Sequence, residues 1–358
     1  MSDKLRAGII ACGRMSYAHS RAYAAMPDVE LVAGADISPE ALARFRDEFG
    51  ISKEHTYTDY VEMLEKEELD LISIVSLHHQ HAEMTIKAAE YQPKAILCEK
   101  PIAVSLGEAD AMIDACEAAG TRLIIGHQRR YNAQYVAAYR ALKGGAIGDL
   151  VTIETHGHPF SSLMVDGTHT IDLARWYADE APIAWVLGQI DWTEARSGWG
   201  TRVENAAMFL YGFENGLRAM HTCGGAPVDG DSEERNVLWP AVTGPNYHWI
   251  LLRGTEGEIW VWGDRPTEGI PWVRLVRGGH EEELPVPELP GTAHERLVRD
   301  MIDRATDGGP HTLDAASARD TLEVLMAAYE SSRRRGMIML PLDVAENPLF
   351  AMMDADRT

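Results

Sequence analysis

The sequence predicts an α/β protein in which a doubly wound parallel sheet is followed by an α+β region with a large, mostly antiparallel sheet. Up to Gly126, short apolar segments alternate with amphipathic helical segments. Beyond it, longer segments of alternating polarity follow one another. The chain has 358 residues, more than one hydrophobic core usually organises. We therefore expect two domains, over residues 1–127 and 128–358.

The N-terminal domain shows a regular alternation of strand and helix patterns. Its expected strands are 5–11, 29–35, 69–76, 95–98 and 123–126. The helices expected between them, from apolar residues at helical spacing, are 16–26, 39–49, 80–91 and 106–119. Such crossovers join parallel strands, so each strand should end at the same edge of the sheet.

The C-terminal domain is predicted to begin with a helix at 132–143. Its expected strands are 151–155, 206–211, 217–222, 259–262 and 272–276. A long amphipathic helix at 315–335 is expected to pack back toward the N-terminal domain. All nine tryptophans lie in this half, which suits a core or a subunit interface, so we expect a homodimer or homotetramer through the C-terminal sheet.

Composition narrows the class of protein. The formal net charge of -22 argues against a nucleic-acid partner, because phosphates would be repelled. The cysteines at 12, 98, 116 and 223 show no paired spacing, so no disulfide framework is indicated. The first residues contain no long apolar segment, so we expect no signal peptide, no membrane span and a cytoplasmic location.

The turn after the first expected strand matches part of a dinucleotide fingerprint. Ala11 stands in place of the first glycine of G-x-G-x-x-G and Ser16 in place of the third, while Gly13 remains where the backbone must approach a pyrophosphate. Cys12, Arg14 and Met15 complete the turn and are expected cofactor contacts. A plain tight turn in a doubly wound fold is the alternative.

Asp36 ends the second strand, about 20 residues further on, where an acid accepts hydrogen bonds from both ribose hydroxyls. Ile37 follows it, and no arginine is present to accept a 2′-phosphate, so NAD is favoured over NADP. Ser76, Leu77 and His78 end the strand predicted at 69–76 and are expected beside the nicotinamide.

Lys100 is the first candidate for catalysis. The apolar strand 95–98 ends in Glu99, Lys100 and Pro101. Carboxyl ends of strands are where ligands bind in open α/β sheets, and buried lysines are rare unless paired or used. A surface lysine at a strand end is the alternative.

The chain resembles the glucose–fructose oxidoreductase and inositol dehydrogenase family of NAD(P)-dependent sugar and polyol dehydrogenases. The resemblance rests on the Gly13 turn, Asp36 and Glu99-Lys100-Pro101, together with His81, the segment from Gly126 to Tyr131, and Gly167-Thr168-His169 followed by Asp172. The resemblance covers nearly the whole chain. It implies an NAD-binding Rossmann domain at 1–127 and a substrate-binding and oligomerisation domain at 128–358. It also implies catalytic positions for Lys100 and His169, and we expect His81, Glu99 and Gln128 near the cofactor.

The chain departs from the family pattern four residues before His169. The aspartate usual there is Val165, and Asp166 stands next to it. Residues three apart on a helix share a face, so Asp166 is a candidate for the same role. Alternatively, Asp166 caps the helix that begins near Gly167.

Oxidising a secondary alcohol requires a base for the hydroxyl proton while hydride leaves for the nicotinamide. We assign His169 as the base and Lys100 as the group that orients and polarises the hydroxyl, although the roles can be reversed. The competing interpretation of His169 is a buried helical histidine satisfied by Asp172.

Substrate contacts are also expected from Arg130, Tyr131 and His158. His156 and His158 alternate along a strand and should share a face. No metal is expected, because neither this pair nor the histidines at 78, 79 and 81 have a third ligand at a recognisable spacing. For Arg129 and Arg130, ion pairing with carboxylates is the alternative.

The leading hypothesis is an NAD-dependent oxidoreductase acting on a secondary hydroxyl of a sugar, cyclitol or sugar derivative, with a small carbohydrate as its partner. An NAD-retaining glycoside hydrolase, which oxidises a sugar transiently, eliminates and re-reduces, is the alternative. A non-catalytic NAD-binding regulator is the third possibility, and it predicts that Lys100→Met leaves function intact.

Overall fold

The computed structural model describes residues 4–158, 161–193, 196–225, 249–264 and 268–355. The chain divides into two compact units: an N-terminal unit of residues 1–131 and 290–319, and a C-terminal unit of residues 132–289 and 320–358. The expected boundary after residue 127 lies near the first crossing. The return of residues 290–319 to the N-terminal unit was not predicted, because patterns within a short stretch of sequence do not show which distant segment it packs against.

The N-terminal unit contains a parallel six-stranded sheet in the order β3-β2-β1-β4-β5-β6. Its strands are β1 (Leu5–Ile10), β2 (Val29–Ala35), β3 (Thr56–Tyr57), β4 (Leu71–Ile74), β5 (Ala95–Cys98) and β6 (Arg122–Ile125). Every residue of β4 and β5 is buried, as expected of central parallel strands covered on both faces. The predicted doubly wound sheet is confirmed, and β3 is too short to have left a pattern.

The helices of this unit are α1 (Ser16–Ala24), α2 (Pro39–Phe49), α3 (Tyr60–Lys66), α4 (His81–Ala89) and α5 (Leu106–Ala119). The ends of α2 and α5 are fixed by local chemistry. Ser38 and Ser105 accept hydrogen bonds from the first-turn amides. Gly50 and Gly120 end the helices in the left-handed conformation.

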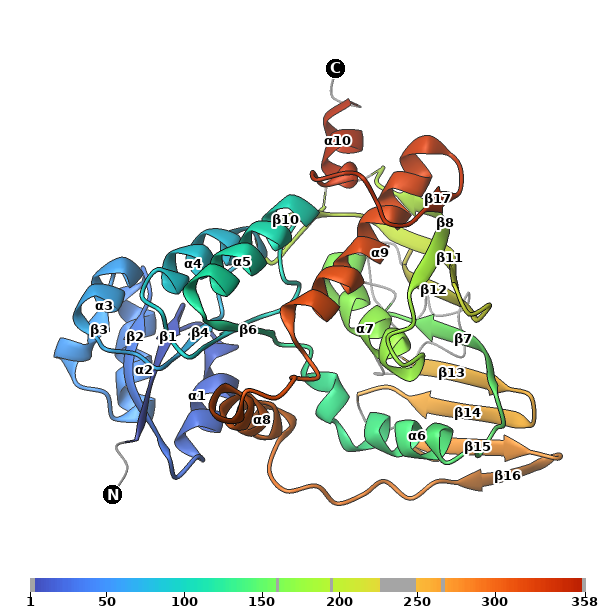
Figure 1. Cartoon of the computed structure of the whole chain (residues 1–358), viewed down its shortest axis with the longest axis horizontal. Helices are drawn as coiled ribbons and strands as arrows, with labels where there is room; N and C mark the ends of the chain where they lie inside the picture. The colour runs from blue at the N-terminus through green and yellow to red at the C-terminus, as the bar shows by residue number, and fades with distance from the viewer. Residues whose placement is uncertain (1–3, 159–160, 194–195, 226–248, 265–267, 356–358) are drawn as a thin grey trace. The chain divides into compact units, whose positions relative to one another are not determined.

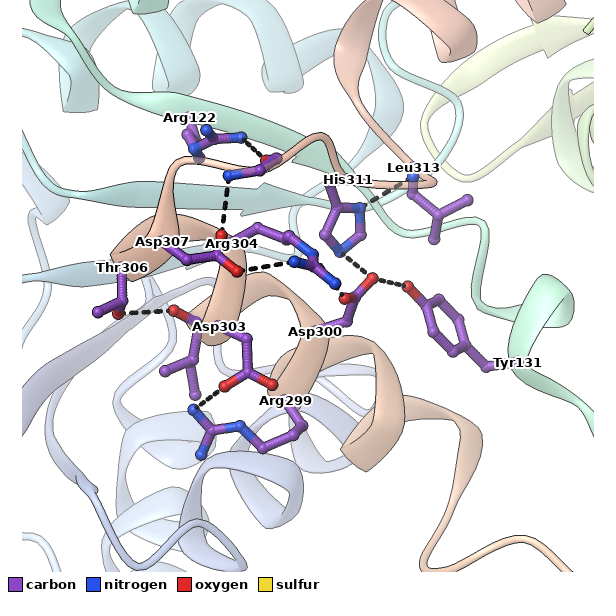
Figure 2. A network of polar contacts seen from close by, with 12 residues as sticks. Arg122, Tyr131, Arg299, Asp300, Asp303, Arg304, Thr306, Asp307, His311 and Leu313 are labelled. Carbon is purple, nitrogen blue, oxygen red and sulfur yellow. Dashed lines mark hydrogen bonds and ion pairs between the residues drawn. The ribbon is translucent and has the colours of Figure 1, made fainter.

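Helix α8 (Ala293–Asp307) brings the returning segment onto the sheet, where it packs beside α1 (Figure 1). Its buried stripe, Leu297, Val298, Met301 and Ile302, joins the core formed by β1, β2, β5 and α1. A polar network secures the other side of α8 (Figure 2). In it, the Tyr131 hydroxyl donates to Asp300 Oδ2 at 2.6 Å.

The C-terminal unit is built on a nine-stranded sheet in the order β16-β15-β14-β13-β7-β12-β11-β8-β17. Its strands are β7 (Leu150–His156), β8 (Ile183–Asp191), β11 (Ala206–Phe213), β12 (Arg218–Gly224), β13 (Trp249–Gly254), β14 (Gly257–Trp262), β15 (Val273–Arg277), β16 (His280–Glu283) and β17 (Ile338–Met339). All neighbours are antiparallel except β12 and β7. The predicted mostly antiparallel sheet is confirmed, although β8, β13 and β16 were not expected.

The two faces of this sheet differ in burial. On β11, Phe209 and Tyr211 are buried, whereas Met208 and Leu210 are 52% and 49% exposed. The remaining helices are α6 (Ala133–Lys143), α7 (Thr168–Tyr177), α9 (Ala315–Arg334) and α10 (Pro348–Ala355), and β9 (Arg196–Gly198) pairs with β10 (Thr201–Val203). Across the described ranges, no helix is both long and apolar enough to cross a membrane.

Candidate active site

The turn between β1 and α1 has the form that a bound phosphate requires. Ala11 adopts φ 71°, the left-handed conformation that the first fingerprint glycine would supply. A Cβ added to Gly13 would meet no protein atom within 4 Å, so the backbone there is open to close approach. The Cys12 side chain is buried, Met15 is half-buried and Arg14 is exposed. Cys12 can therefore contact a cofactor only through its backbone.

Asp36 connects this turn to the end of β2. Its carboxylate accepts the backbone N–H of Cys12 and that of Ser38, each at 2.8 Å. Burial and the nearby Asp36 charge raise the pKa of the Cys12 thiol. Ile37, next along the chain, is 89% exposed. The turn and the acid expected for NAD thus form one hydrogen-bonded unit.

Polar atoms without protein partners lie at two further expected cofactor residues. Among the described residues, neither Ser76 Oγ nor Gln128 Oε1 has a hydrogen-bond partner, although both atoms are buried. Leaving such groups unsatisfied costs roughly 1–3 kcal/mol each. A dinucleotide carries hydroxyl and amide groups that can satisfy them. These residues therefore fit NAD, and Leu77 beside them is 42% exposed.

Two histidines shape the turn between β4 and α4. His81 begins α4 as expected, but its ring is fully buried, with Nδ1 2.8 Å from the Pro101 carbonyl and Nε2 3.2 Å from the Ser76 carbonyl. Burial lowers the pKa of His81, and a neutral ring donates to only one of these oxygens. His81 therefore links the loop after β4, which contains Ser76, to the loop after β5, which contains Pro101. Burial, and then the charge of Lys100, lower the pKa of His78 to about 2.

Lys100 follows β5 and is half-buried, with a cis bond to Pro101. Its backbone N–H donates to Glu99 Oε2 at 3.2 Å. Burial opposes ionisation of Glu99, but the hydrogen bond and charge of His19, together with the charge of Lys100, lower its pKa to about 2. The charge of Lys100 therefore acts on both the buried carboxylate of Glu99 and the neutral imidazole of His78.

Sequence reasoning missed the residues that hold Glu99. His19 Nε2 lies 3.0 Å from Glu99 Oε1, and its Nδ1 lies 3.1 Å from Ser73 Oγ, which also contacts the Tyr23 hydroxyl at 2.8 Å. Both His19 and Ser73 are buried. The available signal was a serine inside the apolar strand β4 and a histidine on the inner face of α1.

His169 lies in the C-terminal unit as the second residue of α7 and is 2% exposed. Asp166 lies in the single π-helical turn Leu163–Gly167, where it accepts a hydrogen bond from Ser161 Oγ at 2.6 Å. Helix α7 is preceded by Gly167 and has no side-chain cap. The N-cap position of α7 is Gly167 and not Asp166, whose Oδ2 accepts from Ser161, so the structure does not support the capping interpretation. Asp172, one turn after His169, is also buried.

A buried acid that the sequence gave no reason to choose supports this turn. Glu204 is fully buried, accepts the Leu163 backbone N–H at 2.5 Å and accepts the Tyr329 hydroxyl at 2.8 Å. Burial raises its pKa. Glu204 thus fixes the start of the turn that carries Asp166, and no local pattern links residues so distant in the chain.

The expectation that His156 and His158 share a strand face is wrong, because β7 ends at His156. His156 stacks on Trp249 with ring centroids 3.6 Å apart, and burial lowers its pKa to about 4. His158 is half-buried in the following loop, where its carbonyl accepts from Ser161 and Gly224. Residues 159 and 160 lie outside the described residues.

Arg130 and Tyr131, expected to contact substrate, make hydrogen bonds inside the N-terminal unit. Arg130 is buried and donates to the Thr312 carbonyl at 3.0 Å and to Ser317 Oγ at 3.4 Å. Tyr131 donates to Asp300, as described above, and burial raises its pKa. Both side chains anchor the returning segment, so the geometry gives no support to their role in substrate binding.

A doubly wound sheet with an open glycine turn, an acid after β2 and a lysine after β5 defines an NAD-binding oxidoreductase. Comparison with known proteins agrees. The family described as "Oxidoreductase family, NAD-binding Rossmann fold" matches residues 5–127. The D-apiose dehydrogenase of Paraburkholderia graminis is 30% identical over 370 residues, covering 96% of this chain and 92% of the relative. The chain therefore belongs to this oxidoreductase family, which includes glucose–fructose oxidoreductase and inositol dehydrogenase.

Two further similarities extend the comparison. The myo-inositol 2-dehydrogenase of Thermotoga maritima is 26% identical over 188 residues, 49% of this chain and 55% of that protein. An oxidoreductase from Agrobacterium radiobacter, solved with NAD+, L-tartaric acid and magnesium, superposes with a TM-score of 0.76 at 20% identity, covering 94% of this chain and 98% of that one. The latter establishes likeness of fold.

Proposed function

We propose that this protein oxidises a secondary hydroxyl of a sugar, cyclitol or sugar derivative, with hydride transfer to NAD. The observation that carries the proposal is the position of Lys100. It follows a buried parallel strand, beside the ionised Glu99 and the neutral His78, at the sheet edge where the cofactor turn also lies. A lysine so placed can bind a hydroxyl oxygen and polarise it.

When bound, NAD accepts the hydride from the carbinol carbon. In the proposed mechanism, Lys100 Nζ orients the substrate hydroxyl, and His169 takes its proton. The reverse assignment, with Lys100 as the base, uses the same residues. Asp166 is proposed to contact substrate or His169 in place of the aspartate absent at Val165. Gly13 and Asp36 bind the pyrophosphate and the ribose hydroxyls.

The substrate class is supported by the relatives' names, which include D-apiose and myo-inositol dehydrogenases. The test is a panel of aldoses, branched pentoses and inositols offered with NAD, with NADH absorbance as the readout. We expect NADH to accumulate with at least one compound. Full NAD binding with no NADH from any of them would remove the proposal.

The same assay, run in D2O with aryl glycosides, distinguishes the proposed dehydrogenase from the alternative, an NAD-retaining glycoside hydrolase. It predicts cleavage without net NADH and entry of deuterium beside the transiently oxidised carbon. Our proposal predicts that glycosides are not cleaved.

We further propose that the exposed face of the nine-stranded sheet packs against a second copy of the chain. Leu187, Met208, Leu210 and Met339 are each at least 40% exposed and lie on neighbouring strands. Contiguous apolar side chains on an open sheet are typical of a subunit interface. We also propose a reducing, cytoplasmic compartment, which is supported by four buried free cysteines.

A further inference from the structure

Three side chains from distant parts of the N-terminal unit converge beside Lys100. They are His19 in α1, Glu99 after β5 and His294 in the first turn of α8. One nitrogen or oxygen atom of each lies within 4.8 Å of the others. His19 Nε2 is 3.0 Å from Glu99 Oε1, and the rings of the two histidines are 5.6 Å apart between centroids.

This cluster contains an unexplained polar atom. His19 and Glu99 are 1% and 6% exposed, and His294 is half-buried. Within the described part of the chain, His294 Nε2 is buried without a hydrogen-bond partner. A buried polar atom left unsatisfied costs roughly 1–3 kcal/mol, so its retention calls for a bound group.

The second polar atoms of His19 and Glu99 are held by neighbouring groups. His19 Nδ1 contacts Ser73 Oγ, and Glu99 Oε2 accepts the Lys100 backbone N–H. This leaves His19 Nε2 and Glu99 Oε1 facing the shared space. Metal-binding histidines are characteristically oriented by such a partner on the second ring nitrogen. Gly126 adds room, because a Cβ there would come within 3.1 Å of Glu99 Oε1.

We propose that His19, Glu99 and His294 bind one divalent transition-metal ion, with Zn²⁺ the best match. Two imidazole nitrogens and one carboxylate oxygen form a donor set that Zn²⁺ accepts, with bonds of about 2.0–2.2 Å and water as a fourth ligand. In a tetrahedral site such bonds place the ligand atoms roughly 3.3 Å apart. The contact of 3.0 Å between His19 and Glu99 is close to this separation.

Mg²⁺ and Ca²⁺ are poorer candidates, because they prefer sites made of oxygen ligands. Charge also favours a dication here. The cluster offers the ion one carboxylate and two imidazoles. A bound metal ion would therefore compensate the negative charge of the buried Glu99 carboxylate.

The ion would link α1, the end of β5 and α8, which are far apart in the sequence. α1 and β5 belong to the first half of the N-terminal unit, whereas α8 arrives from residue 290 onward. A metal bound only in the folded state stabilises it by mass action. The site is thus a clamp on the returning segment. It shares Glu99 with the surroundings of Lys100, but metal binding at it does not rest on the proposed oxidation.

The test uses the full chain without an affinity tag, dialysed against a chelator and then reloaded with Zn²⁺ or Co²⁺ alone. We expect one metal ion per chain by elemental analysis and a higher melting temperature on reloading. Co²⁺ should give the visible absorption bands of a tetrahedral site. His294→Ala should lose the bands and the thermal shift. His280→Ala, which removes an exposed histidine from β16, should keep both.

His294→Cys provides the second variant. A thiolate ligand at this position should retain Co²⁺ and add a sulfur-to-cobalt charge-transfer band, which a purely structural role of residue 294 would not produce. Two results would overturn the proposal: wild-type protein that takes up no metal after reloading, or His294→Ala that binds Co²⁺ as the wild type does. In either case the cluster is a buried, hydrogen-bonded His19–Glu99 pair.

Discussion

The backbone N–H of Cys12 donates to Asp36 Oδ2 at 2.8 Å, which ties the first strand-to-helix turn to the end of β2. The acid that is expected to bind the ribose therefore also shapes the turn that is expected to bind the pyrophosphate.

Replacing Asp36 with Ser should weaken NAD binding through both of these effects. Two backbone amides and the ribose lose their charged acceptor, so we expect the Kd for NAD to rise roughly ten- to a hundredfold. Calorimetric titration with NAD measures this. Glu40→Ser, on the exposed start of α2, is the control. An unchanged Kd in Asp36→Ser would contradict the placement of the ribose.

Two substitutions in the first turn should separate stability from binding. Ala11 pays for a left-handed backbone, so Ala11→Gly should raise the free energy of unfolding by about 1 kcal/mol and keep NAD binding. Gly13→Ala should leave the unliganded protein equally stable, because its Cβ meets no protein atom, yet it should bind NAD poorly. Thermal unfolding with and without NAD reports both effects. Equal NAD affinity in Gly13→Ala and wild type would place the pyrophosphate elsewhere.

Lys100→Met should abolish turnover while preserving the fold. Loss of the polarising ammonium should lower kcat by roughly a hundredfold or more, with little change in NAD affinity. Steady-state kinetics on the substrate found by the panel, alongside NAD titration, provide the measurement. Lys94→Met, an exposed lysine before β5, is the matched control. A kcat near that of the wild type would favour the regulator hypothesis.

His156 should make stability depend on pH in a defined window. Its folded pKa is about 4 against 6.5 for the ordinary group, so the unfolded chain binds more protons between these values. The stabilisation is present above pH 6.5 and falls by up to about 3 kcal/mol as pH drops toward 4. His156→Phe keeps a ring on Trp249 and should flatten this dependence in urea unfolding series, whereas His280→Phe should not. Parallel curves for wild type and His156→Phe would refute the assignment.

Charge placed on the open face of the C-terminal sheet should dissociate the proposed dimer. Leu210→Glu, opposite Leu187 and Met220 on neighbouring strands, would bury a carboxylate in the interface. Light scattering after size exclusion should give twice the chain mass for wild type and the monomer mass for the variant. Tyr91→Glu, in the N-terminal unit, should remain dimeric. A monomeric wild-type protein would end this proposal.

Much of the fold was predictable because it is encoded locally. Strands β2 and β5 and helices α2 and α5 begin and end at the predicted residues, since serine caps, terminal glycines and buried apolar runs lie within the elements themselves. Strands β8 and β13 were missed. The first four residues of β13 are apolar and all buried, and in β8 apolar residues such as Leu187 also lie on the exposed face. In both strands this removes the polar contrast that reveals a strand.

The candidate site also contains features that the sequence could predict and contacts that it could not. Gly13, Asp36 and Lys100 could be proposed from the sequence because each lies at a fixed offset from a strand end. The contacts of Arg130 and Tyr131 with Thr312 and Asp300 could not be predicted, because these partners lie far along the chain. Sequence spacing indicates which residues share an element but not which distant carbonyl or carboxylate a long side chain reaches.

The sequence by itself determined the alternation of strands and helices in the N-terminal unit, the turn after β1 and the lysine that follows β5, because periodicity, capping and turn chemistry act over a few residues. Only the tertiary structure decided that residues 290–319 join the N-terminal unit and that His19, Glu99 and His294 meet. Such contacts arise when apolar faces from distant segments are buried together, and the polar atoms carried with them must then find partners wherever the packing places them.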